Sequence, residues 1–131
     1  MKTKLIAIAY FVFLGVVVYF ADSRAHLHWF TYLRSIPGGD KYGHFLLMGS
    51  LAFLVNLSLS CRVVRIAGRG FLLGSLVVLV LITIEEISQR FIPYRTFDLT
   101  DLLADYLGVF VFSWLALVVQ KRRAVALEGG S

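Results

Sequence analysis

The sequence predicts an all-α, polytopic membrane protein with four transmembrane helices and a short interfacial helix between the first and the second. Hydrophobic residues make up 59% of the 131 residues, whereas soluble domains hold roughly 45 to 50%. The mean hydropathy is +0.81. Charged residues are 16% of the chain, too few to cover long apolar segments with a polar surface. We therefore expect the lipid bilayer to be the solvent.

Four apolar segments have about the length that a hydrocarbon layer of roughly 30 Å requires. They cover residues 5–21, 43–60, 71–84 and 102–119, and the third runs on into the charged stretch that begins at Glu85. The links between them are polar. Pro37, Gly38 and Gly39 end the first link and Pro93 interrupts the third, and proline stops a helix because it lacks a backbone donor. We expect residues 1–120 to form a single transmembrane domain and residues 121–131 to form a basic cytoplasmic tail.

The first segment follows the basic stretch MKTK, an order of charge that a signal peptide shares. Its apolar run is long for a signal peptide, and Tyr19 occupies a position where cleavage before Asp22 would require a small residue. We therefore expect the segment to be retained as a membrane anchor.

Aromatic and aliphatic residues recur at near-helical spacing in the first link. This spacing predicts the short interfacial helix, and aromatic side chains in such a helix lie at headgroup level. The residues concerned are Trp29, Phe30, Tyr32, Leu33 and Ile36.

The distribution of basic residues predicts a cytoplasmic location for both termini. In that orientation, eight of the thirteen basic residues lie inside: Lys2, Lys4, Arg62, Arg65, Arg69, Lys121, Arg122 and Arg123. Acids contribute little to topology, yet all but Glu128 fall on the outer side. The net charge of +5 is then explained by cytoplasmic loops near anionic lipid and does not indicate nucleic-acid binding.

We expect polar residues from three predicted helix ends to meet at the outer face. Asp98, Asp101 and Asp105 have the spacing of one stripe along a helix. Asp105 lies farthest into the span, and because an acid in hydrocarbon costs about 3 kcal/mol, we expect it to face protein or water. The other members of this predicted site are Asp40, Lys41, His44, Glu85, Glu86, Gln89, Arg90 and Arg95.

The ordered motifs of residues 40–110 resemble those of the VanZ-like family of small polytopic bacterial membrane proteins. They are DKYGHF from Asp40, EISQ from Glu86, PYR from Pro93 and DLLADYLG from Asp101. Tyr94 stands where the family has glycine, Asp105 where it has asparagine, and Glu85 is an additional acid. The resemblance implies a fold and a polar constellation. It also implies a link to teicoplanin resistance, the phenotype from which the family takes its name, but no defined reaction.

Several of these residues also have a structural interpretation. Asp40 is expected to be a helix N-cap, since a helix start must satisfy its free amides. Asp98 and Asp101 fit a capping box. His44 is equally well interpreted as a hydrogen-bonded core residue, and Glu86 and Arg95 as a structural ion pair.

The first functional hypothesis is an outward-facing pocket for an envelope lipid or a lipid-linked cell-wall precursor. Lys41, Arg90 and Arg95 would hold a phosphate, with Asp40, Gln89 and Asp98 as further ligand contacts. His44, Glu86, Asp101 and Asp105 are the candidate catalytic residues, as groups that exchange protons. The sequence shows no serine-histidine or cysteine-histidine motif for a nucleophile, so it leaves open whether the protein is an enzyme.

Two alternatives remain. In one, the polar residues form a structural network in a scaffold or partner-binding protein. In the other, they belong to a proton or cation pathway, which the inner halves of the spans disfavour because they contain no ionisable residue. A haem site is weaker, since His44 is the one histidine within a span, and the single cysteine, Cys61, excludes a cysteine-built metal site. Cofactor and oligomeric state are not predicted.

Overall fold

The computed structural model describes residues 2–22, 32, 35–93 and 97–130, and this part of the chain is mostly helical. The helices are α1 (Lys2–Asp22), α3 (Gly39–Ser58), α4 (Leu73–Gln89) and α5 (Leu99–Gly129). Two short strands, β1 (Val63–Ile66) and β2 (Arg69–Leu72), separate α3 from α4. All four predicted long helices are therefore present.

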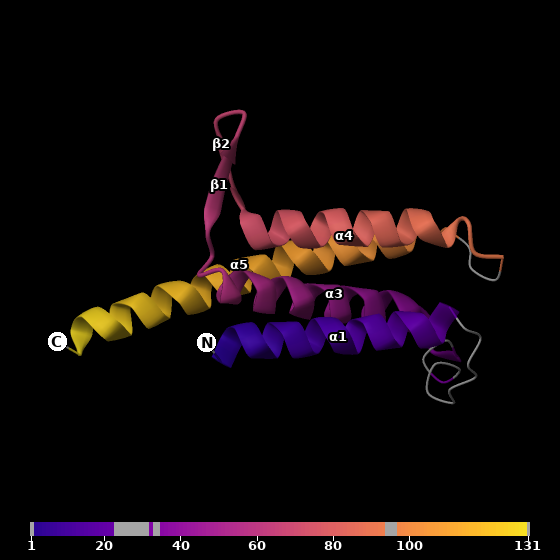
Figure 1. Ribbon diagram of the computed structural model, residues 1–131, viewed down its shortest axis with the longest axis horizontal. Helices are drawn as coiled ribbons and strands as arrows, with labels where there is room; N and C mark the ends of the chain where they lie inside the picture. Colours follow the sequence, from indigo (N-terminus) through magenta and orange to yellow (C-terminus); the bar gives the residue numbers. More distant parts are fainter. Residues whose placement is uncertain (1, 23–31, 33–34, 94–96, 131) are drawn as a thin grey trace.

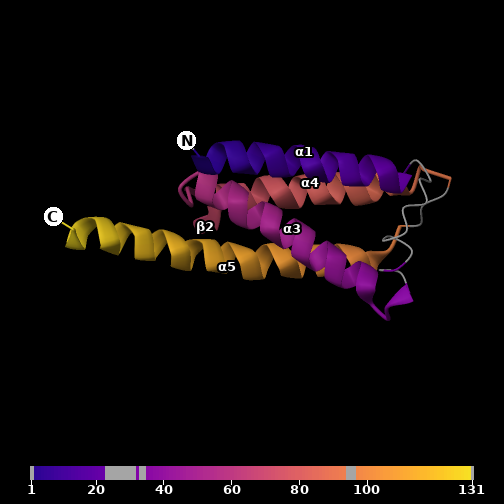
Figure 2. The ribbon, with the colours of Figure 1, turned by 90° about the horizontal axis from the view of Figure 1, so that it is seen from below.

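The four helices lie alongside one another and alternate in direction (Figures 1 and 2). α3 contacts α1, α4 and α5, and α4 also contacts α5. α3 and α5 begin at the end of the bundle where α1 and α4 finish, which we call the network end. The chain enters α1 at the opposite end, which also carries the two strands and which we call the hairpin end. The last turns of α5 project beyond the other helices there.

The core of the bundle is apolar and receives side chains from every helix. It consists of Leu14, Leu51, Ala52, Val78, Ile82, Leu102 and Val109. The helices α3 and α5 pack closely where Gly108 faces the backbone of Phe45. A Cβ at Gly108 would run into the Phe45 carbonyl, so the glycine permits this approach. The rings of Phe45 and Phe112 meet edge to face, with centroids 5.9 Å apart.

A neutral polar cluster joins three helices near the hairpin end. The amide of Asn56, which is fully buried, donates to the hydroxyls of Ser75 at 2.9 Å and Ser113 at 3.1 Å. Its carbonyl accepts from the Ser75 backbone amide at 3.1 Å. Gly74 leaves room for this side chain, because a Cβ there would meet the Asn56 amide. The cluster therefore satisfies its polar groups without any charge.

The outer surface of the bundle is largely apolar. Among the described residues, α5 is the one helix whose length and composition alone would allow it to cross a membrane. Large apolar side chains are exposed on α1, α4 and α5, including Leu5, Ile8, Val80, Ile84, Phe110 and Trp114. This surface contrasts with the polar outer face that a helix of a soluble bundle presents.

Three sequence expectations need correction or lie outside the described part. The segment expected to be a plain polar link forms an antiparallel hairpin, and the third helix begins at Leu73. The fourth helix does not stop at residue 119 but continues through the predicted tail to Gly129, because the tail holds no proline and no glycine before that point. The predicted interfacial helix falls mainly on residues outside the described ranges.

Because Gly108 lies against the Phe45 backbone, we expect a single methyl group added at position 108 to destabilise the protein. We expect Gly108→Ala to lower the stability of the protein by about 1 to 3 kcal/mol, because the added Cβ must push α3 and α5 apart. Gly43→Ala is the matched control, since a Cβ at Gly43 meets open space and alanine favours helix. Thermal unfolding in detergent checks both variants. Equal melting temperatures would contradict the close packing.

Candidate functional site

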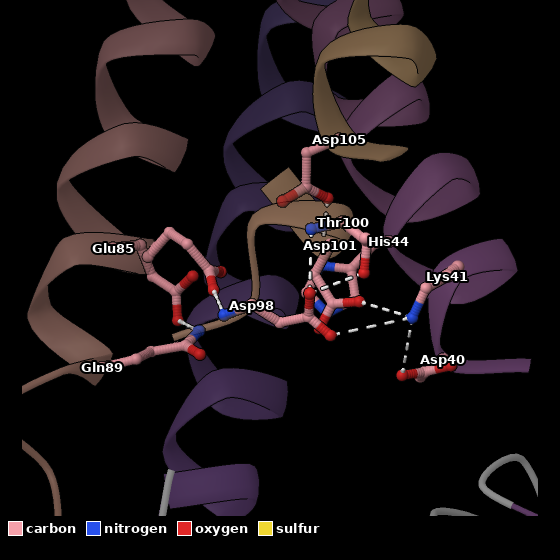
Figure 3. A network of polar contacts seen from close by, with 10 residues as sticks. Asp40, Lys41, His44, Glu85, Gln89, Asp98, Thr100, Asp101 and Asp105 are labelled. Carbon is pink, nitrogen blue, oxygen red and sulfur yellow. Dashed lines mark hydrogen bonds and ion pairs between the residues drawn. The ribbon is translucent and has the colours of Figure 1, made fainter. Parts of the chain in front are cut away.

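Side chains from α3, α4 and α5 form a polar network at the network end (Figure 3). The stripe of acids on α5 faces α3, as its spacing predicted, and the last turn of α4 lies beside the start of α5. We use the name polar network for Asp40, Lys41, His44, Glu85, Glu86, Gln89, Asp98, Asp101 and Asp105.

Asp98 caps the N-terminus of α5. Its Oδ1 accepts hydrogen bonds from the Thr100 amide at 2.8 Å and the Thr100 hydroxyl at 2.6 Å. These bonds, the hydroxyl first, lower the pKa of the Asp98 carboxyl below its usual value, because they favour the charged form. The predicted capping role of Asp98 is confirmed.

The backbone amide of Asp98 is satisfied from another helix. In a capping box the third residue of the same helix would accept this hydrogen bond, and that residue is Asp101. Here Glu86 Oε1 on α4 accepts it instead, at 3.2 Å. Glu86 therefore ties the end of α4 to the start of α5. The Asp101 carboxylate is left free to face α3.

Lys41 is the cation around which three carboxylates gather. Its Nζ lies 3.4 Å from Asp101 Oδ1, 3.7 Å from Asp40 Oδ2 and 3.8 Å from Asp98 Oδ2. The Lys41 side chain is 41% exposed, so solvent screens these contacts and the ammonium remains accessible from outside. This part of the network lies at the surface.

His44 continues the network into the bundle. Its Nδ1 lies 3.0 Å from Asp105 Oδ1, and its Nε2 lies 3.8 Å from Asp101 Oδ2. Asp105 is 1% exposed, so this carboxylate depends on a protein partner. Charged and polar groups thus alternate from the surface inward, in the order Lys41, Asp101, His44 and Asp105.

Two carboxylate oxygens in the network are buried without a hydrogen-bond partner among the described residues. They are Asp105 Oδ2 and Glu86 Oε2, and both side chains are 1% exposed. An unsatisfied buried acceptor costs about 1 to 3 kcal/mol, and more when it is charged. Both oxygens therefore lack the donor that a buried acceptor requires.

The remaining predicted site residues differ in their contacts. Gln89 is buried and its Nε2 donates to Glu85 Oε1 at 2.6 Å. The Arg90 side chain is exposed and makes no hydrogen bond or ion pair with another described residue. Glu86 is paired with the Asp98 backbone and not with Arg90. Arg95 and its predicted ion pair with Glu86 lie outside the described residues.

The prediction that Asp40 is an N-cap is wrong. Gly38 occupies that position, with φ of +71°, and gives no side-chain cap. Asp40 lies in the first turn of α3, where an acid is favoured by the helix dipole, and its carboxylate contacts Lys41. The glycine takes the position because a positive φ is strained for other residues.

The network can bind donors and exchange protons. Carboxylates and an imidazole are general acids and bases, and Asp105 holds the His44 ring in one orientation. Within the described ranges, no group of three or more histidine, cysteine, aspartate or glutamate side chains is arranged to hold a metal ion. The role of Thr100 as a donor to Asp98 was missed in the sequence, although its position two residues after the cap is a signal for it.

Comparison with known proteins identifies the family. The family model described as VanZ/LLP1 matches residues 3–120, which extends the resemblance seen in residues 40–110 to nearly the whole chain. No curated protein and no solved structure matches the chain. Because the match includes all four helices and the polar network, the chain belongs to the VanZ/LLP1 family.

Proposed function

We propose that the protein is a multi-pass protein of the bacterial cytoplasmic membrane, with α1, α3, α4 and α5 crossing the bilayer. The exposed apolar side chains along these helices support this placement, since water would not favour so large an apolar surface. The core that joins the helices is continuous from α1 to α5. If α5 spans the membrane, the helices packed along it are in the bilayer as well.

The orientation that we propose has both termini in the cytoplasm. Basic residues gather toward the hairpin end, and acids gather at the network end. Basic residues near span ends favour the cytoplasmic side. The polar network then lies at the outer surface of the membrane. Members of the basic group are Lys2, Lys4, Arg62, Arg65, Arg69, Lys121, Arg122 and Arg123.

Cysteine labelling checks this orientation. In a Cys61→Ser background, we expect Ser35→Cys to react with a membrane-impermeant maleimide added to intact cells. Ala67→Cys, in the turn of the hairpin, should react after the cells are opened. The reverse pattern would place the polar network in the cytoplasm and would exclude a ligand from the outer leaflet.

We propose that the polar network binds the polar headgroup of an envelope lipid or of a lipid-linked cell-wall precursor. The observation that supports this most is the pair of buried, unpartnered oxygens on Glu86 and Asp105. Hydroxyl groups of a sugar or the ammonium of an amine headgroup would supply the missing donors. Lys41 and Arg90, both accessible, would contact a phosphate at the surface.

The negative charge of the polar network limits where a phosphate group can bind. Lys41 is already shared by three carboxylates, which repel a phosphate. Donor groups of the headgroup are therefore proposed to enter toward Asp105, with the phosphate held at the exposed rim. Any reaction would use His44, Glu86, Asp101 or Asp105 for proton transfer, with His44 oriented by Asp105.

A structural role is the second candidate, and the bond between Glu86 and Asp98 favours it. This bond and the pair formed by His44 and Asp105 join three helix ends, which is what a scaffold would need. A proton pathway has less support. The apolar core, including Val78, Ile82 and Val109, separates the polar network from the neutral cluster around Asn56.

Native mass spectrometry of gently solubilised protein distinguishes binding from scaffolding. We expect a lipid or precursor mass to remain bound to the wild type and to be reduced at least several-fold in His44→Gln. Tyr42→Phe, an exposed position in the first turns of the same helix, is the matched control and should retain the mass. Loss of teicoplanin tolerance in cells carrying His44→Gln would be the accompanying phenotype.

The contradicting result is equally specific. The binding proposal fails if the wild type carries no specific adduct, or if His44→Gln retains the adduct as fully as Tyr42→Phe. A lower melting temperature of His44→Gln in that case would favour the structural role.

A further inference from the structure

The hairpin formed by β1 and β2 projects sideways from the bundle. In Figure 1 it extends crosswise to the helices, and in Figure 2, turned by 90°, it occupies little of the length of the bundle. If the helices cross a membrane, an element that runs crosswise at their end lies parallel to the membrane surface. The hairpin end is the cytoplasmic end in the orientation proposed above.

The hairpin is poorly supported by the protein itself. Leu72 packs near Leu57, Cys61 and Ala116 at the base, but the side chains farther out are exposed, with Val63 at 57% and Ile66 at 52%. A two-stranded hairpin alone in water is marginal. Ala67 and Gly68 form its turn with φ of +50° and +78°, which is a favoured hairpin geometry but adds strain at the alanine. A contact outside the chain would stabilise it.

The strand register gives both faces of the hairpin an apolar part and a basic part. Val64 lies opposite Phe71 and Ile66 lies opposite Arg69, and directly opposed residues share a face. On the other face Val63 pairs with Leu72, and Arg65 pairs with Gly70. Long arginine side chains can hold their stems along apolar surface and their charge in a polar layer.

The charge of the hairpin is of one sign. Arg62, Arg65 and Arg69 are exposed, and residues 61–72 contain no acid. Among the described residues, none of these arginines forms an ion pair. A basic element with exposed valine, isoleucine and phenylalanine has the composition of a segment that binds an anionic membrane surface.

We propose that the hairpin lies in the headgroup layer of the cytoplasmic leaflet and binds anionic phospholipid through Arg65 and Arg69. Its apolar side chains enter the boundary of the hydrocarbon, and the guanidinium groups contact lipid phosphates. The inference rests on the membrane placement and orientation proposed above, but it does not depend on what the polar network binds.

Nitroxide labels in reconstituted full-length protein test this placement. In a Cys61→Ser background, single cysteines are placed at Ile66, at Val80 on the exposed face of α4, and at Leu127 on the projecting end of α5. Power saturation with oxygen and with a water-soluble nickel chelate reports depth in vesicles of phosphatidylcholine, with and without phosphatidylglycerol. With phosphatidylglycerol, we expect the Ile66 label to be several-fold less accessible to nickel than the Leu127 label. It should also be shallower than the Val80 label.

Replacing the two arginines tests how much their charge contributes to membrane binding by the hairpin. Arg65→Gln with Arg69→Gln should raise the nickel accessibility of the Ile66 label severalfold in anionic vesicles and change it little in phosphatidylcholine. The proposal would be overturned if nickel reaches the Ile66 label as readily as the Leu127 label in anionic vesicles. It would also be overturned if the Ile66 label is protected from nickel to the same degree with and without the two arginines and with and without anionic lipid, because that result would indicate a protein contact. If the Val80 label is also open to nickel, the membrane placement itself fails.

Discussion

The buried carboxylate of Asp105 is the constraint on which the arrangement of the network end depends. A carboxylate that is 1% exposed must find a partner within the protein, and His44 Nδ1 at 3.0 Å supplies it. The pair requires α3 and α5 to lie very close. Gly108, one turn farther along the same face of α5, allows this by removing the side chain that would otherwise meet Phe45. The polar contact of His44 with Asp105 and the close packing at Gly108 therefore both bring α3 and α5 together.

The start of α5 concentrates negative charge where a helix tolerates it best. Asp98 and Asp101 lie in or before the first turn, where free amides and the helix dipole favour acids. Glu86 adds a third carboxylate from α4 and accepts a hydrogen bond from the Asp98 amide, which Asp101 would accept in a local capping box. One carboxylate oxygen of Glu86 accepts a hydrogen bond from the Asp98 amide, and one of Asp105 contacts His44. Their second oxygens are buried without a donor among the described residues, and the proposed recognition of a headgroup would use this unmet acceptor capacity.

Much of the architecture could be predicted from sequence because long apolar segments bounded by polar links leave a strong signal. The four apolar segments became four helices, and the spacing of Asp98, Asp101 and Asp105 placed them opposite Lys41 and His44. The hairpin could not be predicted, since its strands have four residues each and its turn has alanine where asparagine is usual. The contact between Glu86 and Asp98 joins separate helices, so no local pattern contains it. Asp40 was misassigned because Gly38 already fulfils the geometry of the helix start.

A double-mutant cycle between His44 and Asp105 tests most directly whether this pair joins the two helices. The free energy of unfolding would be measured in detergent for the wild type, His44→Ala, Asp105→Ala and the double variant. The structure predicts a coupling of about 1 to 3 kcal/mol. His44→Ala leaves the buried Asp105 carboxylate without its partner, Asp105→Ala deprives the half-buried His44 ring of its shortest contact, and the double change removes both groups. Additive effects, with no coupling beyond error, would contradict the pair and with it the proposed basis of the polar network.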